Sequence, residues 1–204
     1  MKTRTTGTPT HHPSLSGLNK TILTRLAKLG IAAKSELVLH LPLRYDDETR
    51  LYPINEAPQG QSVLVEGRVV TCEVKYRPRR QLVCHIEDGS GVLTLRFLNF
   101  YTSQQKQLAE GVRVRAFGEI RQGFFGDEMV HPKYRVVPAD EPVSRALTPV
   151  YPTTAGLGQD TLRRLIARAL TDCDLTDTLP EAVIATLRLP LFRESVLFLH
   201  NPPP

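Results

Sequence analysis

The sequence predicts an α+β protein in which a small antiparallel β-barrel lies between two helical segments. Three observations lead to this fold class. Near both ends of the chain, apolar residues recur every three to four positions, which is typical of helices that bury one face. Between residues 61 and 138 the spacing changes to two, as expected for strands. Glycine-rich turns separate these short stretches, which favours a barrel or a small sandwich.

Length and composition place the chain among ordinary globular proteins. It has 204 residues, of which 41% are hydrophobic, so it can bury a core as one large domain or two small ones. The net charge is +5, from 26 Lys and Arg against 21 Asp and Glu, and its meaning depends on where the bases lie. No apolar run approaches the roughly 20 residues that a membrane helix needs, so we expect no membrane contact.

Cysteine and histidine spacing argues against a metal site. Cys72, Cys84 and Cys173 are odd in number and have no CxxC spacing, which predicts neither a disulfide framework nor a zinc site. A reducing cytoplasm is therefore the expected location. The histidines share no ligand spacing either. Residues 1–14 lack the apolar stretch of a secretory signal, and we expect a disordered arm there.

Residues 15–60 are expected to form a helical subdomain and a connector. Four apolar residues form one face of a first helix: Leu18, Ile22, Leu26 and Leu29. Gly30 should end this helix in the left-handed conformation. Ser35 is expected to N-cap a second short helix, which Pro42 ends. Two short helices about a glycine turn resemble a helix-hairpin-helix unit, which either holds DNA through its turn amides or serves only as a packing element.

Residues 61–138 are expected to form the barrel. Five strand-like stretches occupy residues 61–74, 81–88, 91–101, 112–121 and 128–137. A short helical or irregular link lies between the third and the fourth. Pro132 interrupts the fifth, which is therefore bulged or at a sheet edge. This count and order match a five-stranded antiparallel OB-fold barrel, with a small sandwich as the alternative.

Residues 139–204 are expected to form an extended linker followed by helices. Prolines hold residues 147–152 in an extended conformation. Residues 160–171 have the pattern of an amphipathic helix, and two shorter helices should end at Leu187 and His200. The last residues have the composition of a linker, which suggests a boundary before a further domain.

Aromatic and basic residues gather at two neighbouring turns of the predicted barrel. At the exit of the third strand, exposed rings could stack on bases, each contributing about 1–3 kcal/mol, or the same rings could complete the core. A basic loop between the first two strands could neutralise phosphates or be a solvated hairpin tip. Two phenylalanines in a glycine loop are a second contact or a plug. The candidate DNA-binding residues are Lys75, Tyr76, Arg77, Arg79, Arg80, Arg96, Phe97, Asn99, Phe100, Tyr101, Phe124 and Phe125.

Six short motifs occur in an order that is found in one known family. They are LVLHLPLRYDD at residues 37–47, DGSG at 88–91, FLNF at 97–100, HPKY at 131–134, LTPVYPTT at 147–154 and LHNPP at 199–203. A helix that ends in LAKLGI, residues 26–31, precedes them. Together, over residues 15–204, they resemble the N-terminal wedge region of the RecG family of bacterial ATP-dependent DNA helicases.

The resemblance implies a protein that binds branched DNA. In that family an OB-fold wedge separates parental duplex from nascent arms at stalled forks and Holliday junctions, while RecA-like motor domains pull the duplex. This chain has neither a GxxxxGK[ST] loop nor a DExH box, so we expect no ATPase in it by itself. ATP and Mg²⁺ would belong to the missing motor domains. We therefore expect the wedge portion alone, as a truncated product or a fragment, and a monomer.

The resemblance leaves two points open. Many family members have a Phe-Asn-x-x-Tyr motif whose aromatic rings cap base pairs, whereas here Leu98 precedes Asn99 and Thr102 occupies the tyrosine position. The nearby rings of Phe97, Phe100 and Tyr101 are therefore the substitutes for the aromatic residues of that motif. The resemblance also implies an alternative function, a module that contacts single-stranded-DNA-binding protein. Peptide docking should survive replacement of Phe100 and Tyr101 by alanine, while fork binding should fall.

Overall fold

The computed structural model describes residues 15, 17–124 and 126–204, and the chain divides into two compact units. The helical unit consists of Met1–Tyr45 and Pro149–Pro202, and the β unit of Asp46–Thr148 and Pro203–Pro204. The fold is a mixed α+β fold, as the sequence predicts. The predicted boundaries assign the two ends of the chain to separate segments, whereas in the structure their helices share one core. The arm predicted at residues 1–14 lies outside the described residues.

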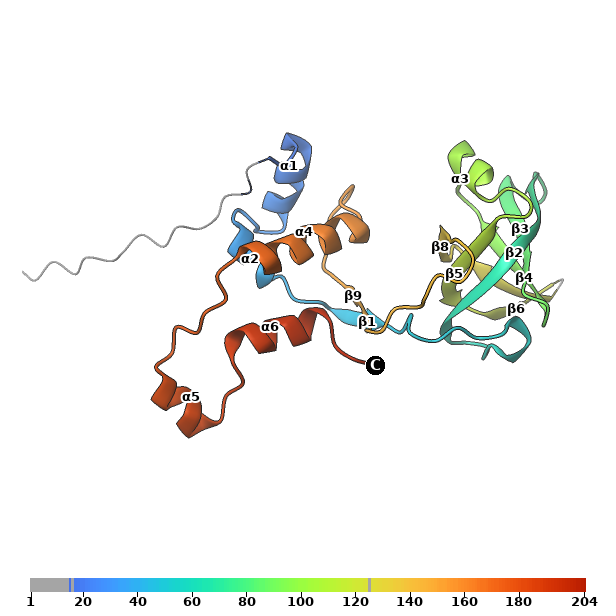
Figure 1. Ribbon diagram of the computed structural model, residues 1–204. Helices are drawn as coiled ribbons and strands as arrows, with labels where there is room; N and C mark the ends of the chain where they lie inside the picture. Colours follow the sequence, from blue (N-terminus) through green and yellow to red (C-terminus); the bar gives the residue numbers. More distant parts are fainter. Residues whose placement is uncertain (1–14, 16, 125) are drawn as a thin grey trace, which may run out of the picture. The chain divides into compact units, whose positions relative to one another are not determined.

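Among the described residues, five helices make up the helical unit (Figure 1): α1 (Lys20–Lys28), α2 (Lys34–Val38), α4 (Gln159–Asp172), α5 (Glu181–Leu187) and α6 (Phe192–His200). Apolar side chains from both ends of the sequence form its core, among them Leu26, Leu37, Leu157, Leu162, Ile166 and Val196. A two-stranded sheet pairs β1 (Arg44–Asp46) with β9 (Thr148–Val150). No helix in the described part of the chain is long and apolar enough to cross a membrane.

The first two helices begin and end for reasons that are visible in their caps. Asn19 caps α1, because its side-chain oxygen accepts the N–H of Thr21 at 2.8 Å. Gly30 has a φ of 77°, the left-handed end that the sequence predicts. The predicted cap of α2 is wrong, because Ser35 lies inside the helix and Ala33 precedes it. Glu36 takes over the capping role: its carboxylate accepts the N–H groups of both residues before Lys34.

A buried network of tyrosine and histidine fixes α6 within the helical unit. The Nε2–H of His200 donates to the carbonyl of Val38 at 2.8 Å, so its Nδ1 accepts the O–H of Tyr151, also at 2.8 Å. His40 Nε2 contacts the carbonyl of Pro152 at 2.9 Å. Burial lowers the pKa of His200 and raises the pKa of Tyr151 to about 12. The neutral forms of both side chains are therefore favoured.

Seven strands form one sheet in the β unit, in the order β6-β7-β4-β3-β2-β5-β8. The strands are β2 (Ser62–Lys75), β3 (Gln81–Glu87), β4 (Val92–Phe97), β5 (Arg113–Glu119), β6 (Arg121–Gly123), β7 (Gly126–Val130) and β8 (Lys133–Val136). A single core lies against one face of this sheet. It includes Val65, Leu82, Ile86, Leu93, Leu95, Phe97, Val114, Ile120 and Met129.

The fifth predicted strand is two strands in the structure. Pro132 has no N–H to donate to a strand partner, and His131 before it has a φ of 52°. The strand is therefore interrupted between β7 and β8. The first half pairs parallel to β4 and the second antiparallel to β5, so the sheet is not purely antiparallel as predicted. Two strands that are neighbours along the chain thus pair with opposite ends of the run β4-β3-β2-β5.

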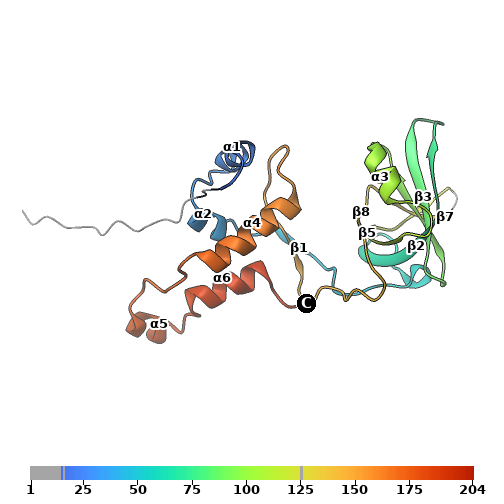
Figure 2. The ribbon, with the colours of Figure 1, turned by 45° about the horizontal axis from the view of Figure 1, so that its top comes forward.

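Strand β2 serves two partners in succession. Its first half pairs with β5 over Ser62–Arg68, and its second half pairs with β3 over Arg68–Lys75. The register of the second pairing shifts between Val69 and Thr71, which marks a β-bulge. Beyond this bulge, β2 and β3 continue as a hairpin. Figure 2 shows the hairpin at the same end of the β unit as α3 (Thr102–Gln107).

A disulfide joins Cys72 and Cys84, which corrects the expectation drawn from cysteine spacing. The two residues lie directly opposite each other in the register of β2 and β3. The two cysteines are 12 residues apart, a spacing that matches no known cysteine motif, and the pairing of the strands brings them together. Cys173 in the helical unit is a free, buried cysteine, and burial raises the pKa of its thiol.

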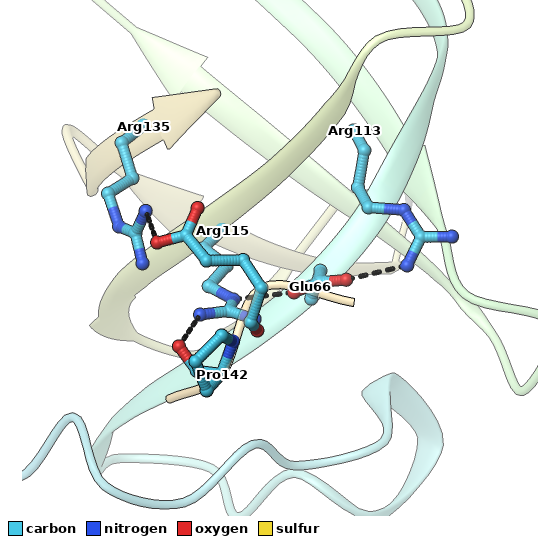
Figure 3. Close-up of polar contacts among 6 residues, drawn as sticks. Glu66, Arg113, Arg115, Arg135 and Pro142 are labelled. Atoms are coloured by element: carbon cyan, nitrogen blue, oxygen red, sulfur yellow. Dashed lines mark hydrogen bonds and ion pairs between the residues drawn. The ribbon is translucent and has the colours of Figure 1, made fainter. Parts of the chain in front are cut away.

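A buried arginine holds the segment that leaves the β unit (Figure 3). Arg115 is only 3% exposed, and its Nε contacts Glu66 at 2.5 Å. The two Nη atoms of Arg115 donate to the backbone carbonyls of Glu141 and Pro142. Burial alone would raise the pKa of Glu66, but hydrogen bonds from Arg115 and Arg113 outweigh this and lower it. The cluster therefore fastens residues 141–142 to β5.

Candidate nucleic-acid interface

The basic loop is the tip of the β2–β3 hairpin. All five of its candidate residues are exposed: Lys75, Tyr76, Arg77, Arg79 and Arg80. Lys75 pairs with Glu73 at 3.1 Å, whereas within the described chain no carboxylate pairs with the three arginines. Unpaired guanidinium groups at a solvated tip can each neutralise a phosphate and release a counterion. The loop therefore presents a local positive charge that the modest net charge of the chain conceals.

The three rings at the end of β4 have different surroundings. Phe97 is 2% exposed and packs in the core, with its ring centroid 5.4 Å from that of Tyr134. Phe100 is half-buried against the same core. Tyr101 is 79% exposed, at the position just before α3. Strand β4 ends at Phe97 and not at Tyr101 as predicted, so the last two rings lie on a loop.

The basic hairpin and the aromatic loop meet in space. The guanidinium carbon of Arg80 lies 4.2 Å from the ring centroid of Phe100, which is a cation–π contact between the two loops. A groove of about 340 Å³ follows this contact. Its lining residues are Arg80, Leu98, Asn99, Phe100 and Tyr101. The groove thus combines a cation, an amide side chain and an exposed ring, which are the groups that bind phosphates and bases.

Arg96 lies on the face of β4 opposite to the core residues Leu95 and Phe97, and it has hydrogen-bond partners of its own. Its Nε donates to Glu128 at 2.8 Å and its Nη1 to Gln81 at 2.9 Å. Glu128 is buried and also contacts Arg121 at 3.3 Å. Because its donors are engaged, Arg96 links β3, β4 and β7 rather than extending a free charge into the groove.

The glycine loop that follows β6 contains the remaining candidates. Phe124 is exposed at the turn between β6 and β7. Phe125 lies outside the described residues. Gly126 has a φ of 112°, which only glycine adopts readily, and this explains the glycine at the end of the turn.

Two residues that sequence reasoning did not assign to the site position the aromatic loop. His131 Nε2 accepts the N–H of Leu98 at 3.3 Å, where β4 ends. Gln104 Oε1 accepts the N–H of Tyr101 at 3.0 Å, where α3 begins. The loop is therefore held at both ends. The available signals were the HPKY motif at residues 131–134 and a glutamine three residues after the N-cap position of a helix.

The model of the RecG wedge domain family matches residues 17–173. The chain belongs to the RecG wedge domain family. Among curated relatives, the ATP-dependent DNA helicase RecG of Escherichia coli K12 is 44% identical over 200 residues, which are 94% of this chain and 28% of the relative. RecG of Haemophilus influenzae is 38% identical over 94% of this chain and 28% of its own length. The chain thus spans little more than a quarter of these relatives.

A solved structure of RecG bound to a three-way DNA junction has the same fold. It aligns with a TM-score of 0.77 over 98% of this chain and 28% of that chain, at 22% identity. At this identity the likeness establishes the fold alone. The agreement extends over both units of the present chain, since almost all of its residues are covered.

The sequence contains no phosphate-binding GxxxxGK[ST] loop. Among the described residues, no three His, Cys, Asp or Glu side chains come together as metal ligands.

Proposed function

We propose that this chain binds branched DNA, at stalled replication forks and Holliday junctions, and separates its strands as the wedge part of an ATP-dependent helicase in the bacterial cytoplasm. The observation that carries the proposal is the meeting of the basic hairpin with the aromatic loop. At a junction, duplex and single strands diverge at one point. A site that recognises this point needs charge for the phosphates and a flat face for the first unpaired base, side by side.

Each part of the groove has a role in this proposal. Arg77 and Arg79 extend from the hairpin tip and neutralise phosphates of the arms. Tyr101 presents its ring to the terminal base pair or to the base displaced from it. Arg80 and Phe100 form the floor, where the cation covers one face of the ring. Phe97 is left out of the contact set because its ring is buried in the core.

Magnitudes indicate how much strand separation this groove achieves alone. Stacking on the exposed ring of Tyr101 provides about 1–3 kcal/mol. Opening one base-pair step of DNA costs about 1.4 kcal/mol on average. The groove therefore holds open about one or two steps at a junction, and further opening needs an energy source. We place the energy source, ATP with Mg²⁺, in the part of the relatives that lies outside the match.

We also propose that the sheet closes into an OB-type barrel. The support is the topology: β7 and β8 follow each other along the chain and pair with opposite ends of the four-strand run between them. The helix α3 lies between β4 and β5, at the place where OB folds carry a helix. In such barrels the loops that correspond to the β2–β3 and β6–β7 turns flank the binding face.

A titration of this chain with a fork, a three-way junction and a linear duplex of equal length tests the proposal. We expect the two branched DNAs to bind more tightly. If the four bases of the hairpin each contact a phosphate, the affinity should fall about 150-fold between 50 and 200 mM salt. Equal affinity for fork and linear duplex at both salt concentrations contradicts the wedge function.

Paired variants separate the groove from general charge. Replacing Phe100 and Tyr101 by alanine should remove the preference for forks, because the stacking faces are lost. Replacing the exposed Arg145 and Arg193 by alanine removes two charges elsewhere and serves as the control. A control pair that weakens fork binding as much as the ring pair would show that only net charge matters.

A further inference from the structure

A row of polar side chains crosses four neighbouring strands of the β unit, on the sheet face opposite to the core. The pairing register of the strands places its members on the same face. The row consists of Gln81 on β3, Arg96 on β4, Glu128 on β7 and Arg121 on β6. Gln81 and Glu128 are only 5% and 9% exposed. Buried polar groups need hydrogen-bond partners, and these two find theirs within the row.

Arg96 determines the direction in which the amide of Gln81 points. Its Nη1–H donates to Gln81 Oε1 at 2.9 Å, so the amide nitrogen is left to donate elsewhere. That nitrogen donates to the backbone carbonyl of Arg77, in the basic loop, at 3.3 Å. Without Arg96 the amide oxygen lacks its donor, and the amide can rotate away from the carbonyl. The backbone of the basic loop is therefore fixed through Arg96.

Arg96 also determines the position of Glu128. Its Nε–H donates to Glu128 Oε2 at 2.8 Å, and the other carboxylate oxygen contacts Arg121 Nε at 3.3 Å, where β6 begins. The Glu128 side chain lies against Gly123, because a Cβ at that position would come within 2.9 Å of the Glu128 Cδ. Gly123 directly precedes Phe124 in the β6–β7 turn. The base of this turn is therefore fixed through Arg96 as well.

The strands themselves are already joined without this row. Backbone pairing connects β3, β4 and β7, and the apolar core packs on their other face. The row adds contacts at its two ends, which are a backbone carbonyl of the basic loop and the base of the β6–β7 turn. A buried polar network whose members are all satisfied specifies one arrangement of the groups that it joins. Here those groups are two separate loops.

We propose that Arg96 is a positioning residue that holds the basic loop and the β6–β7 turn at a fixed distance, so that Arg77 and Phe124 contact one DNA branch point together. Phe124 is 93% exposed and supplies a ring for stacking at a distance from the groove of Tyr101. Arg96 acts through its partners and does not touch the DNA. The inference rests on the proposed function, because it requires DNA binding by the β unit.

Backbone ¹⁵N relaxation of the chain without DNA tests the positioning. Arg96→Met keeps the apolar stem of the side chain and removes its donors. This variant should lower the order parameters of both residues 76–80 and residues 122–124, from about 0.85 to about 0.6 or below. Gln81→Leu should lower only those of the basic loop, and Arg121→Met only those of the turn.

A matched control separates the row from ion pairs in general. Arg113 pairs with Glu66 at 2.8 Å in the same unit, and its side chain is 31% exposed, against 22% for Arg96. Arg113→Met therefore removes one partly buried cation that joins β2 to β5 and belongs to neither loop. The order parameters of both loops should stay unchanged in this variant.

A double-mutant cycle in fork binding tests whether the two loops act together. Arg77→Ala and Phe124→Ala should each weaken binding by the wild-type chain. The double variant should weaken it by at least about threefold less than the product of the two losses, because a fork that has lost one contact is no longer aligned with the other. In the Arg96→Met background the two losses should multiply to within about twofold. A purely structural role of Arg96 would lower every affinity and leave the coupling unchanged.

Two outcomes overturn the inference. One is a folded Arg96→Met chain in which both loops keep their order parameters. The other is a coupling that is absent from the wild-type cycle or equally large in the Arg96→Met cycle. Circular dichroism checks folding, and if Arg96→Met does not fold, Gln81→Leu combined with Arg121→Met replaces it and should release both loops. Equal binding of fork and linear duplex by the wild-type chain would refute the proposed function instead, and the relaxation measurement, which needs no DNA, would still decide the positioning.

Discussion

Replacing Arg115 by alanine should destabilise the β unit more than any other change to a charged residue in the cluster of Figure 3. The side chain is 3% exposed, and it serves one carboxylate and two backbone carbonyls. Breaking a buried ion pair from one side costs about 3–5 kcal/mol, because the remaining partner stays desolvated. Glu66 keeps Arg113 at 2.8 Å, which reduces this part of the loss. The backbone carbonyls of Glu141 and Pro142 add to the loss of stability, because each costs about 1–3 kcal/mol when it is left without a hydrogen-bond donor.

We therefore expect a loss of about 3–5 kcal/mol for Arg115→Ala. For a unit of this size that lowers the melting temperature by at least about 12 °C. Urea unfolding followed by circular dichroism measures the change. Arg135→Ala is the internal control, because Arg135 is half-exposed and pairs only with Glu141, so its loss should cost under about 1 kcal/mol. Equal effects of the two substitutions would refute the reasoning, since burial would then not matter.

Three further predictions concern binding and pH. Replacing Arg77 and Arg79 by alanine should lower the slope of log affinity against log salt by about 2, as measured by fork titration at four salt concentrations. Tyr101→Ala should weaken fork binding by about 1–3 kcal/mol without changing the melting temperature, whereas Phe97→Ala should lower the melting temperature by removing a core ring. Because burial lowers the pKa of His200, the folded helical unit resists protonation. Its stability should be fully present above the ordinary histidine pKa of about 6.5 and should fall as the pH drops below that value. Urea midpoints between pH 7.5 and pH 5.5 test this, and His200→Gln should flatten the dependence.

Local patterns in the sequence account for much of the fold. The apolar spacing around Leu26 and the glycine at position 30 are sufficient to place α1 and its end. The alternation in β2 and β3 is a property of neighbouring residues, so the hairpin is predictable. The parallel pairing of β7 with β4 is not, because it joins residues 34 positions apart, such as Thr94 and Glu128, and no local pattern specifies it. The pairing of Cys72 with Cys84 depends on strand register in the same way.

The candidate site was predictable to a similar degree. Arginines of the basic loop were expected at the surface because unpaired charges are rarely buried. For the rings, the sequence contained more information than its motifs suggest: Phe97 alternates in phase with Leu93 and Leu95, and all three are buried. Tyr101 lies after the strand has ended, where alternation no longer indicates a direction. The position of its loop depends on Gln104 in the helix that follows at once, and on His131, which contacts Leu98 from a distant part of the sequence.

The bulge in β2 separates the basic loop from the part of the strand that pairs with β5. Up to Arg68 the strand is bound on the β5 side, and beyond Thr71 it is carried by β3 alone. The hairpin tip is therefore joined to the rest of the sheet through the irregular step between Val69 and Thr71. Inserting or deleting one residue at that step would change the direction in which the hairpin extends. The charged and aromatic side chains themselves would stay the same. The spacing between phosphate contacts and stacking contacts can thus vary independently of the chemistry of either.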